Sequence, residues 1–209
     1  MCYWNCGAIG DMHPYQVDDK IRQRVFILTA ILAVLTARLL SLLVMNLPFA
    51  IPWYIEIPSV LGLFGAYIWF YDHVLWKYWP LSKLGWFQIP DLNGKWNVII
   101  KSSYGGFEDT TNAIATIRQT ASKICIGLQM EKSSSYSIHS VLTRIDRINP
   151  FQLIYHYINQ PKADALKTMA IHQGTTWLDI SDDLKVMEGD YYSGRGRQRF
   201  GTIKFTRST

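Results

Sequence analysis

The feature that most constrains this chain is a long apolar stretch near its beginning, residues 25–76. Its first part, VFILTAILAVLTARLLSLLVMNL, covers residues 25–47. As a helix this part would extend about 34 Å, which is enough to cross the hydrocarbon core of a bilayer. A second apolar run begins near Trp53 and continues to about Tyr71, or as far as Trp76, with aromatic residues towards both ends. We therefore expect a hairpin of two transmembrane helices over residues 25–76.

Two charged residues stand out within this hairpin. Arg38 lies near the middle of the first span, and Glu56 lies near the beginning of the second. A central arginine costs about 2.5–3.5 kcal/mol on insertion scales, whereas each Val, Ile, Leu or Phe contributes about −0.3 to −0.6 kcal/mol. The first span is therefore still expected to insert. Arg38 is either a functional partner charge, within an oligomer or for Glu56, or an arginine that extends its charge towards the interface.

The basic residues around the spans predict their orientation. No Lys or Arg lies in the connection between the spans, and the flanking basic residues are Lys20, Arg22, Arg24, Lys77 and Lys83. By the positive-inside rule, both ends of the chain should be cytoplasmic. This makes residues 1–24 a cytoplasmic N-terminal segment and residues 77–90 a linker. A cleaved signal peptide does not fit, because the first run is long and a second run follows it.

Residues 91–209 have the composition of one soluble domain that is rich in β-strands. Alternating or β-branched runs are separated by turn residues, and no run has strong helical periodicity. The eight runs are residues 94–103, 112–120, 123–131, 136–145, 151–158, 168–180, 184–192 and 198–207. Consecutive strands with short connections predict an up-and-down antiparallel meander, which buries its edges best as a closed barrel. An eight-stranded barrel has room inside for side chains or for one small ligand.

In such a meander, the loops that follow odd-numbered strands share one rim. This rim would gather Tyr, Gly, Lys and Arg residues, including the hairpin YYSGRGRQR. Guanidinium groups bind phosphate through two parallel hydrogen bonds, and tyrosine rings stack on bases. The candidate ligand-binding residues are Tyr104, Tyr136, Tyr192, Arg195, Arg197 and Arg199. The alternative for the arginines is an exposed basic hairpin that touches lipid headgroups or nothing.

Several classes of function are disfavoured. The formal net charge of +5 is too small an excess to indicate binding to a nucleic-acid polymer. No catalytic or cofactor-binding motif is present, so we expect neither an enzyme nor a cofactor. Cys2, Cys6 and His13 could be considered as metal ligands, but they lack a fourth ligand and we expect no metal. With Cys125, the odd number of cysteines favours a reducing compartment.

The order of these parts leads to a known family. Two N-terminal spans are followed by a strand-rich domain that opens with LNGKWNV and closes with GDYYSGRGRQRFGTIKFTR. This arrangement resembles the two-transmembrane β-barrel effectors of bacterial cyclic-oligonucleotide-based anti-phage signalling (CBASS). The resemblance implies a barrel that binds a cyclic dinucleotide as activating ligand, and a functional link to a nucleotide synthase of the CD-NTase class. It also implies membrane spans in the bacterial inner membrane that self-associate into homo-oligomers and disrupt this lipid bilayer, so that the infected cell stops growing or dies.

Two other classes remain open from the residues alone. A membrane-anchored, lipocalin-like carrier of lipids or small molecules would use the barrel as a container, and it predicts a continuous apolar cavity. A structural or assembly protein would use the barrel to bind another protein, and it predicts no nucleotidyltransferase gene nearby.

Overall fold

The computed structural model describes residues 11–17, 19–46, 59–78, 89–144, 151–166, 169–194 and 199–208. The chain forms two compact units, one of residues 19–89 and the other of residues 1–18 together with 90–209. The first unit contains helix α1 (Asp19–Met45), helix α2 (Val60–His73) and the short 3-10 helix η1 (Leu75–Lys77). The second unit is built from β-strands.

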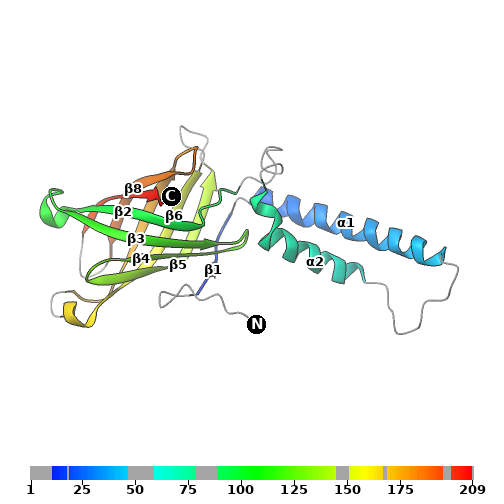
Figure 1. Ribbon diagram of the computed structural model, residues 1–209, viewed down its shortest axis with the longest axis horizontal. Helices are drawn as coiled ribbons and strands as arrows, with labels where there is room; N and C mark the ends of the chain where they lie inside the picture. Colours follow the sequence, from blue (N-terminus) through cyan, green and yellow to red (C-terminus); the bar gives the residue numbers. More distant parts are fainter. Residues whose placement is uncertain are drawn as a thin grey trace. The chain divides into compact units, whose positions relative to one another are not determined.

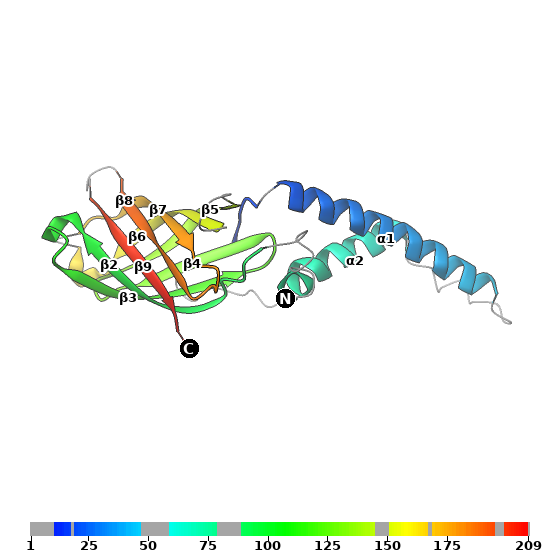
Figure 2. The same cartoon turned by 90° about the horizontal axis from the view of Figure 1, so that it is seen from above.

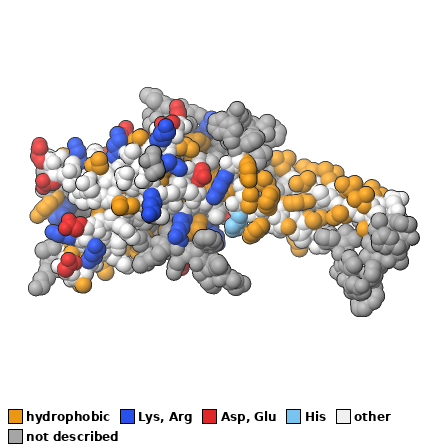
Figure 3. All heavy atoms as spheres, viewed as in Figure 1, with side chains coloured by type: hydrophobic (Ala, Val, Ile, Leu, Met, Phe, Trp, Pro, Cys, Tyr) orange, Lys and Arg blue, Asp and Glu red, His pale blue; other side chains and the backbone are white. Residues whose placement is uncertain are grey.

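Helix α1 has the properties expected of a membrane span. It has 27 residues and a mean hydropathy of 2.4 over its most apolar window, and only 6% of that window is buried. Side chains such as Leu35 and Leu39 are exposed by 62% and 56%. Figure 3 shows hydrophobic side chains along the visible face of this unit. Among the described residues, α1 is the one helix that is long and apolar enough to cross a membrane.

Helix α2 lies beside α1 and is shorter (Figures 1 and 2). Its 14 residues are fewer than the roughly 20 that a crossing needs. The Ser59 hydroxyl caps it by accepting the Gly62 N–H at 3.1 Å. Tyr67 of α2 donates to the Thr36 hydroxyl of α1 at 3.1 Å. The expected second span begins within residues 47–58, which lie outside the described residues, so the two-span hairpin stays a prediction.

The strand-rich unit is an eight-stranded antiparallel barrel, as the sequence predicts. Each strand from β2 to β9 pairs with the next, and β2 pairs with β9, so the sheet closes (Figure 2). The bounds lie within a few residues of the expected ones for most strands. The strands are β2 (Gly94–Ser102), β3 (Thr110–Gln119), β4 (Lys123–Gln129), β5 (Ser133–Arg144), β6 (Phe151–Pro161), β7 (His172–Ile180), β8 (Val186–Ser193) and β9 (Phe200–Arg207).

One end of the barrel is filled by apolar side chains. Inward-facing residues from alternate strand positions meet there and are fully buried, among them Trp96, Leu153, Leu178, Met187 and Phe205. The Trp96 indole donates to the carbonyl of Leu92 at 3.0 Å. Arg207 lies over the Trp96 ring at 4.7 Å and donates to three backbone carbonyls, those of Leu184, Asn93 and Asp91. This end is a closed, packed core.

The sequence did not predict a ninth strand. Strand β1 (His13–Pro14) pairs with β4 in the barrel wall (Figure 1). It lies where β4 and β5 separate. These two strands pair with each other only between Gly127–Gln129 and Ser134–Tyr136. Two residues, one of them proline, carry no alternating pattern from which a strand could be recognised.

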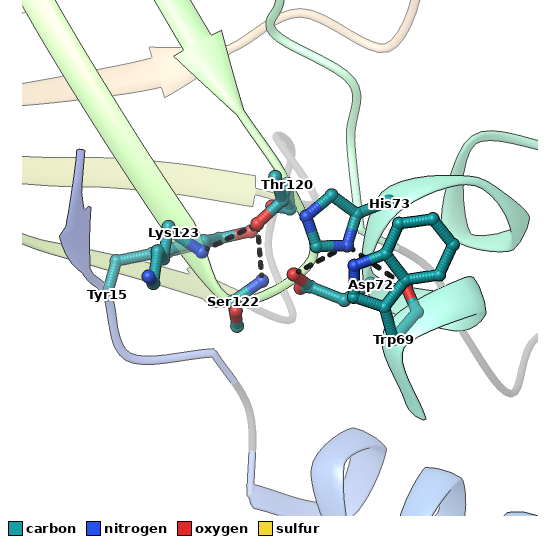
Figure 4. Close-up of polar contacts among 7 residues, drawn as sticks. All are labelled: Tyr15, Trp69, Asp72, His73, Thr120, Ser122 and Lys123. Atoms are coloured by element: carbon teal, nitrogen blue, oxygen red, sulfur yellow. Dashed lines mark hydrogen bonds and ion pairs between the residues drawn. The ribbon is translucent and has the colours of Figure 1, made fainter. Parts of the chain in front are cut away.

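The turn between β3 and β4 lies next to this N-terminal segment. The Thr120 hydroxyl accepts the backbone N–H groups of Ser122 and Lys123 at 3.3 and 3.1 Å (Figure 4). The Ser122 carbonyl in turn accepts the N–H of Tyr15 at 3.2 Å. A local side-chain bond thus holds the turn in a shape that binds the N-terminal segment.

Candidate ligand cavity

The half of the barrel opposite the packed end is hollow. It encloses a cavity of about 400 Å³, which is within the usual range for small-molecule sites. Residues from four connections converge at its mouth, as the predicted meander requires. These residues are Tyr104 in the 3-10 helix η2 (Ser103–Gly105) after β2, Lys132 between β4 and β5, Met169 after the 3-10 helix η3 (Ala163–Ala165), and Arg199 before β9.

The wall of the cavity combines apolar side chains, such as Ile100, Leu128 and Ile203, with polar and aromatic ones. It includes Ser133 and Ser135 of β5, Tyr155, Tyr157 and Asn159 of β6, Thr176 of β7 and Tyr191 of β8. Tyr155 is almost fully buried, and this burial raises the pKa of its hydroxyl, so the group keeps its proton. Asn159 is also buried, and among the described groups its Oδ1 has no hydrogen-bond partner. These groups present hydrogen-bonding positions deep inside the barrel.

Two glycines make room for the cavity tyrosines. A Cβ on Gly174 would overlap the hydroxyl of Tyr157, its cross-strand partner. A Cβ on Gly201 would approach the Tyr191 ring to 2.7 Å and would overlap the carbonyl of Lys101. Both rings therefore lie over positions where only hydrogen fits.

The mouth of the cavity holds a cation on an aromatic face. The guanidinium of Arg199 lies 3.8 Å from the centre of the Tyr104 ring. Arg199 is half-buried, whereas Tyr104 is 76% exposed. Lys132 and His172 add basic groups to the lining, and Asp109 and Glu131 add acidic ones. The pair of Tyr104 and Arg199 offers a flat face and a charged fork to an anionic, aromatic ligand.

The structure brings two of the six predicted ligand residues together at the cavity, namely Tyr104 and Arg199. Tyr136 and Tyr192 are not among the residues that line it. The rings of Tyr192 and Trp177 form a T-shaped pair with 5.3 Å between their centres, and Tyr192 is 51% exposed. Arg195 and Arg197 fall outside the described residues, as do Glu56, Cys2 and Cys6. Arg38 is exposed on α1, and the His13 Nε2 lies 2.8 Å from the Ser137 hydroxyl.

The sequence analysis missed the deep polar groups of the cavity. In the run FQLIYHYINQ, the face that begins with buried Leu153 continues through Tyr155, Tyr157 and Asn159. Polar residues at inward-facing positions of a barrel strand indicate a lined cavity instead of a packed core. The alternation that located the strand therefore also carried this signal.

Comparisons with known proteins agree with this architecture. Residues 87–207 match the family described as Cap15, cyclic dinucleotide receptor domain. A CD-NTase-associated protein 15 from Yersinia aleksiciae is 35% identical over 144 residues, which cover 68% of this chain and 66% of that protein. A protein of the same name from Staphylococcus schleiferi is 28% identical over 125 residues, which cover 59% of this chain and 64% of that protein. The matched regions thus span just under two thirds of each relative. Because the family match takes in the whole barrel, the chain belongs to the Cap15 cyclic dinucleotide receptor domain family.

Proposed function

We propose that this chain is a CBASS effector whose barrel cavity binds a cyclic dinucleotide. The observation that carries the proposal is the stacked pair of Tyr104 and Arg199 at the mouth of a cavity whose wall holds tyrosines and other hydrogen-bonding groups. A cyclic dinucleotide has two phosphates and two bases, so it needs cations and aromatic faces close together. The membership of residues 87–207 in a cyclic dinucleotide receptor family supports the same ligand class.

The mouth and the interior of the cavity would contact different parts of the ligand. At the mouth, the Arg199 guanidinium would bind a phosphate and the Tyr104 ring would stack on a base. Deeper in the barrel, hydroxyl and amide groups of Tyr155, Thr176 and Asn159 would bind the edge of a base. An incoming donor would satisfy the Asn159 Oδ1, whose burial without a partner is unfavourable.

The polar groups within the lining favour this ligand over a lipid. A lipid carrier needs a continuous apolar cavity, but this cavity includes serines, threonines, tyrosines and an asparagine along its wall. Stripping water from these groups against an alkyl chain would cost free energy with no hydrogen bonds in return. A nucleotide can bond to them.

We further propose that the helical unit is the membrane-acting part. The exposed apolar surface of α1 supports its insertion, and residues 53–76 would form the second span. Both termini would lie in the cytoplasm of a cell whose CD-NTase makes the ligand, and several copies would assemble to disrupt the inner membrane. Arg38 and Glu56 would be the charges that this assembly uses. If cells that express an Arg38→Leu variant still die when the effector is activated, Arg38 has no part in the mechanism.

The binding proposal is tested by titrating synthetic cyclic dinucleotides, with adenine, guanine and uracil in each position, into the full chain in lipid nanodiscs. We expect at least one to bind with a dissociation constant in the micromolar range or below, and the matching linear dinucleotide to bind at least about tenfold more weakly. A fatty acid serves as the comparison for a carrier. Binding of the fatty acid, with no binding of any cyclic dinucleotide, would contradict the proposal.

A further inference from the structure

The short strand β1 fills the gap in the barrel wall where β4 and β5 separate. His13 and Pro14 of β1 pair with β4, and Gln16, just after β1, forms a parallel bridge to Val141 of β5. The backbone pairings that hold this segment are His13 with Ile124, Pro14 with Lys123 and Gln16 with Val141. The backbone hydrogen bonds run from the Tyr15 N–H to the Ser122 carbonyl at 3.2 Å, from the Gln16 N–H to the Ser140 carbonyl at 3.1 Å, and from the Leu142 N–H to the Gln16 carbonyl at 2.9 Å.

The Tyr15 side chain anchors this strand in the wall. It is 8% exposed, and its hydroxyl donates to the carbonyl of Thr120 at 3.2 Å. The same hydroxyl accepts the amide N–H of Gln119 at 3.0 Å. The amide oxygen of Gln119 accepts the N–H of Leu92, at the entry to the first barrel strand. The Tyr15 side chain therefore connects the N-terminal segment to the packed end.

Strand β5 could pair with the same edge of β4 that β1 now occupies. In the paired part of β4 and β5, Leu128 lies opposite Ser135, and Gly127 lies opposite Tyr136. In an antiparallel pair, each step back along one strand is a step forward along the other. The continued register would therefore place Ile124 opposite His139, and Lys123 opposite Ser140. Ile124 and Lys123 are the two β4 residues with which β1 pairs now.

Ser137 lies where the observed pairing and the continued register of β4 with β5 diverge. Its buried hydroxyl is 2.8 Å from the His13 Nε2 and accepts the N–H of Ile126 at 2.9 Å. In the continued register the backbone of Ser137 would lie opposite Ile126 instead. The pairing of β5 with β6 is irregular between Ser137 and His139, so β5 changes its course at this point. The Ser137 hydroxyl thus takes the place of the backbone partner that Ile126 would have in the continued register.

We propose that β1 is a displaceable strand of the barrel wall, in competition with β5 for the edge of β4. In one state β1 is seated and β4 and β5 are split; in the other, β1 is released and β4 and β5 pair along their length. Ligand favours release, because Leu128 on β4 and Ser133 and Ser135 on β5 line the cavity where the two strands already pair. A ligand that contacts both strands holds them in this register, and the same register, continued along β4, excludes β1.

Release would alter how the barrel is joined to the helical unit. The chain passes between the two units twice, after Asp18 and before Pro90. Seated β1 fixes the first of these passages to the barrel wall, only a few residues before α1 begins at Asp19. Its release lengthens the stretch of unpaired chain that precedes α1. The role of ligand in this step rests on the proposed function, whereas the competition between strands does not.

The competition is tested without ligand by amide hydrogen exchange on the full chain in nanodiscs. In Tyr15→Ala we expect residues 11–17 to exchange at least about tenfold faster, while the amides of Ile124 and Ile126 stay protected because β5 replaces β1. Tyr192→Ala, on the outer wall, should change neither segment. Gln16→Pro, which removes the N–H that Ser140 accepts and keeps Tyr15, is the second variant should Tyr15→Ala not fold. Equal loss of protection in residues 11–17 and at Ile124 and Ile126 would overturn the second register.

The coupling to ligand is tested on the unmodified chain at saturation with the tightest-binding cyclic dinucleotide. We expect residues 11–17 to exchange at least about tenfold faster, and residues 124–126 and 137–140 to exchange no faster than before. Unchanged or slower exchange of residues 11–17 at saturation would overturn the coupling. Absence of binding by every cyclic dinucleotide would overturn both the coupling and the proposed function, and the variant experiment would still decide whether the two strands compete.

Discussion

The two halves of the barrel differ although the same strands build both. Along β6, buried Leu153 belongs to the packed end, whereas Tyr155, Tyr157 and Asn159 line the cavity. The period of two and the inward direction are the same throughout; only the chemistry of the inward side chains changes. The packed end therefore carries the stability of the barrel, and the hollow end is free to bind.

This comparison has an energetic basis. Burial of apolar surface contributes roughly 25 cal/mol per Å², which the packed end gains from residues such as Trp96 and Phe205. The hollow end buries hydroxyls and amides and leaves space between them, so it gains less from packing. Substitutions at the two ends should consequently affect different measurements.

The largest effect is expected at the packed end. Trp96→Ala removes a fully buried indole and its hydrogen bond to Leu92, and it should lower the free energy of unfolding by about 3–5 kcal/mol. Denaturant unfolding of the full chain in detergent, followed by the strand signal in circular dichroism, measures this. Trp177→Ala, on the half-buried outer wall, is the matched control and should cost clearly less. Equal losses would show that the packed end has no special role.

The second effect separates binding from stability. Arg199→Ala should leave the unfolding transition nearly unchanged and weaken binding of a cyclic dinucleotide by about 10- to 100-fold, since a charge-assisted hydrogen bond to phosphate contributes about 1.5–3 kcal/mol. Lys204→Ala is the control, because Lys204 points outwards and pairs with Glu188 at 3.1 Å. Similar affinities for the two variants in a calorimetric titration would place the phosphate elsewhere.

A smaller loss is expected at the mouth of the cavity. Tyr104→Leu keeps an apolar side chain but removes the ring over which Arg199 lies, and we expect affinity to fall by about fivefold, or about 1 kcal/mol. Tyr104→Phe keeps the ring and should bind as the unmodified chain does. If Phe and Leu weaken binding to the same extent, the hydroxyl matters and stacking does not.

The smallest effect concerns the gap between β4 and β5 in which β1 lies. Burial lowers the pKa of His13, and nearby His139 lowers it too, against a backbone hydrogen bond that raises it. The seated state therefore binds fewer protons than a released one, so seating should weaken as the pH falls below the ordinary histidine value of about 6.5. Amide exchange of residues 11–17, corrected for intrinsic rates, should rise at pH 5.5 by up to a few fold. His13→Gln should remove this dependence, and a dependence that persists would assign it to another group.

Much of the barrel could be predicted from the sequence, because alternation and turn residues are local signals. The first strand was expected at residues 94–103 and forms at Gly94–Ser102. The rim shared by Tyr104, Lys132 and Arg199 followed from the meander alone. Tyr136 and Tyr192 were selected by residue type near that rim, but strand parity decides which face a residue occupies, and neither lines the cavity.

What the sequence could not reveal depends on contacts between distant segments. Strand β1 forms only because β4 and β5 separate, and residues 13–16 contain no pattern that specifies this. The depth of the cavity depends on where the packed side chains stop, which is set by their fit across the barrel. The two-span prediction rests on hydropathy, which needs no tertiary contact, and α1 agrees with its first half.

The central claim is that the hollow half of the barrel is a receptor site for a cyclic dinucleotide. Its most direct test is an experimental structure of the full chain with a cyclic dinucleotide bound. The account predicts the ligand inside the barrel, with a base against Tyr104, a phosphate at Arg199 and a base edge near Tyr155 and Asn159. A ligand bound to the outer wall, or to the helical unit with the cavity empty, would contradict it.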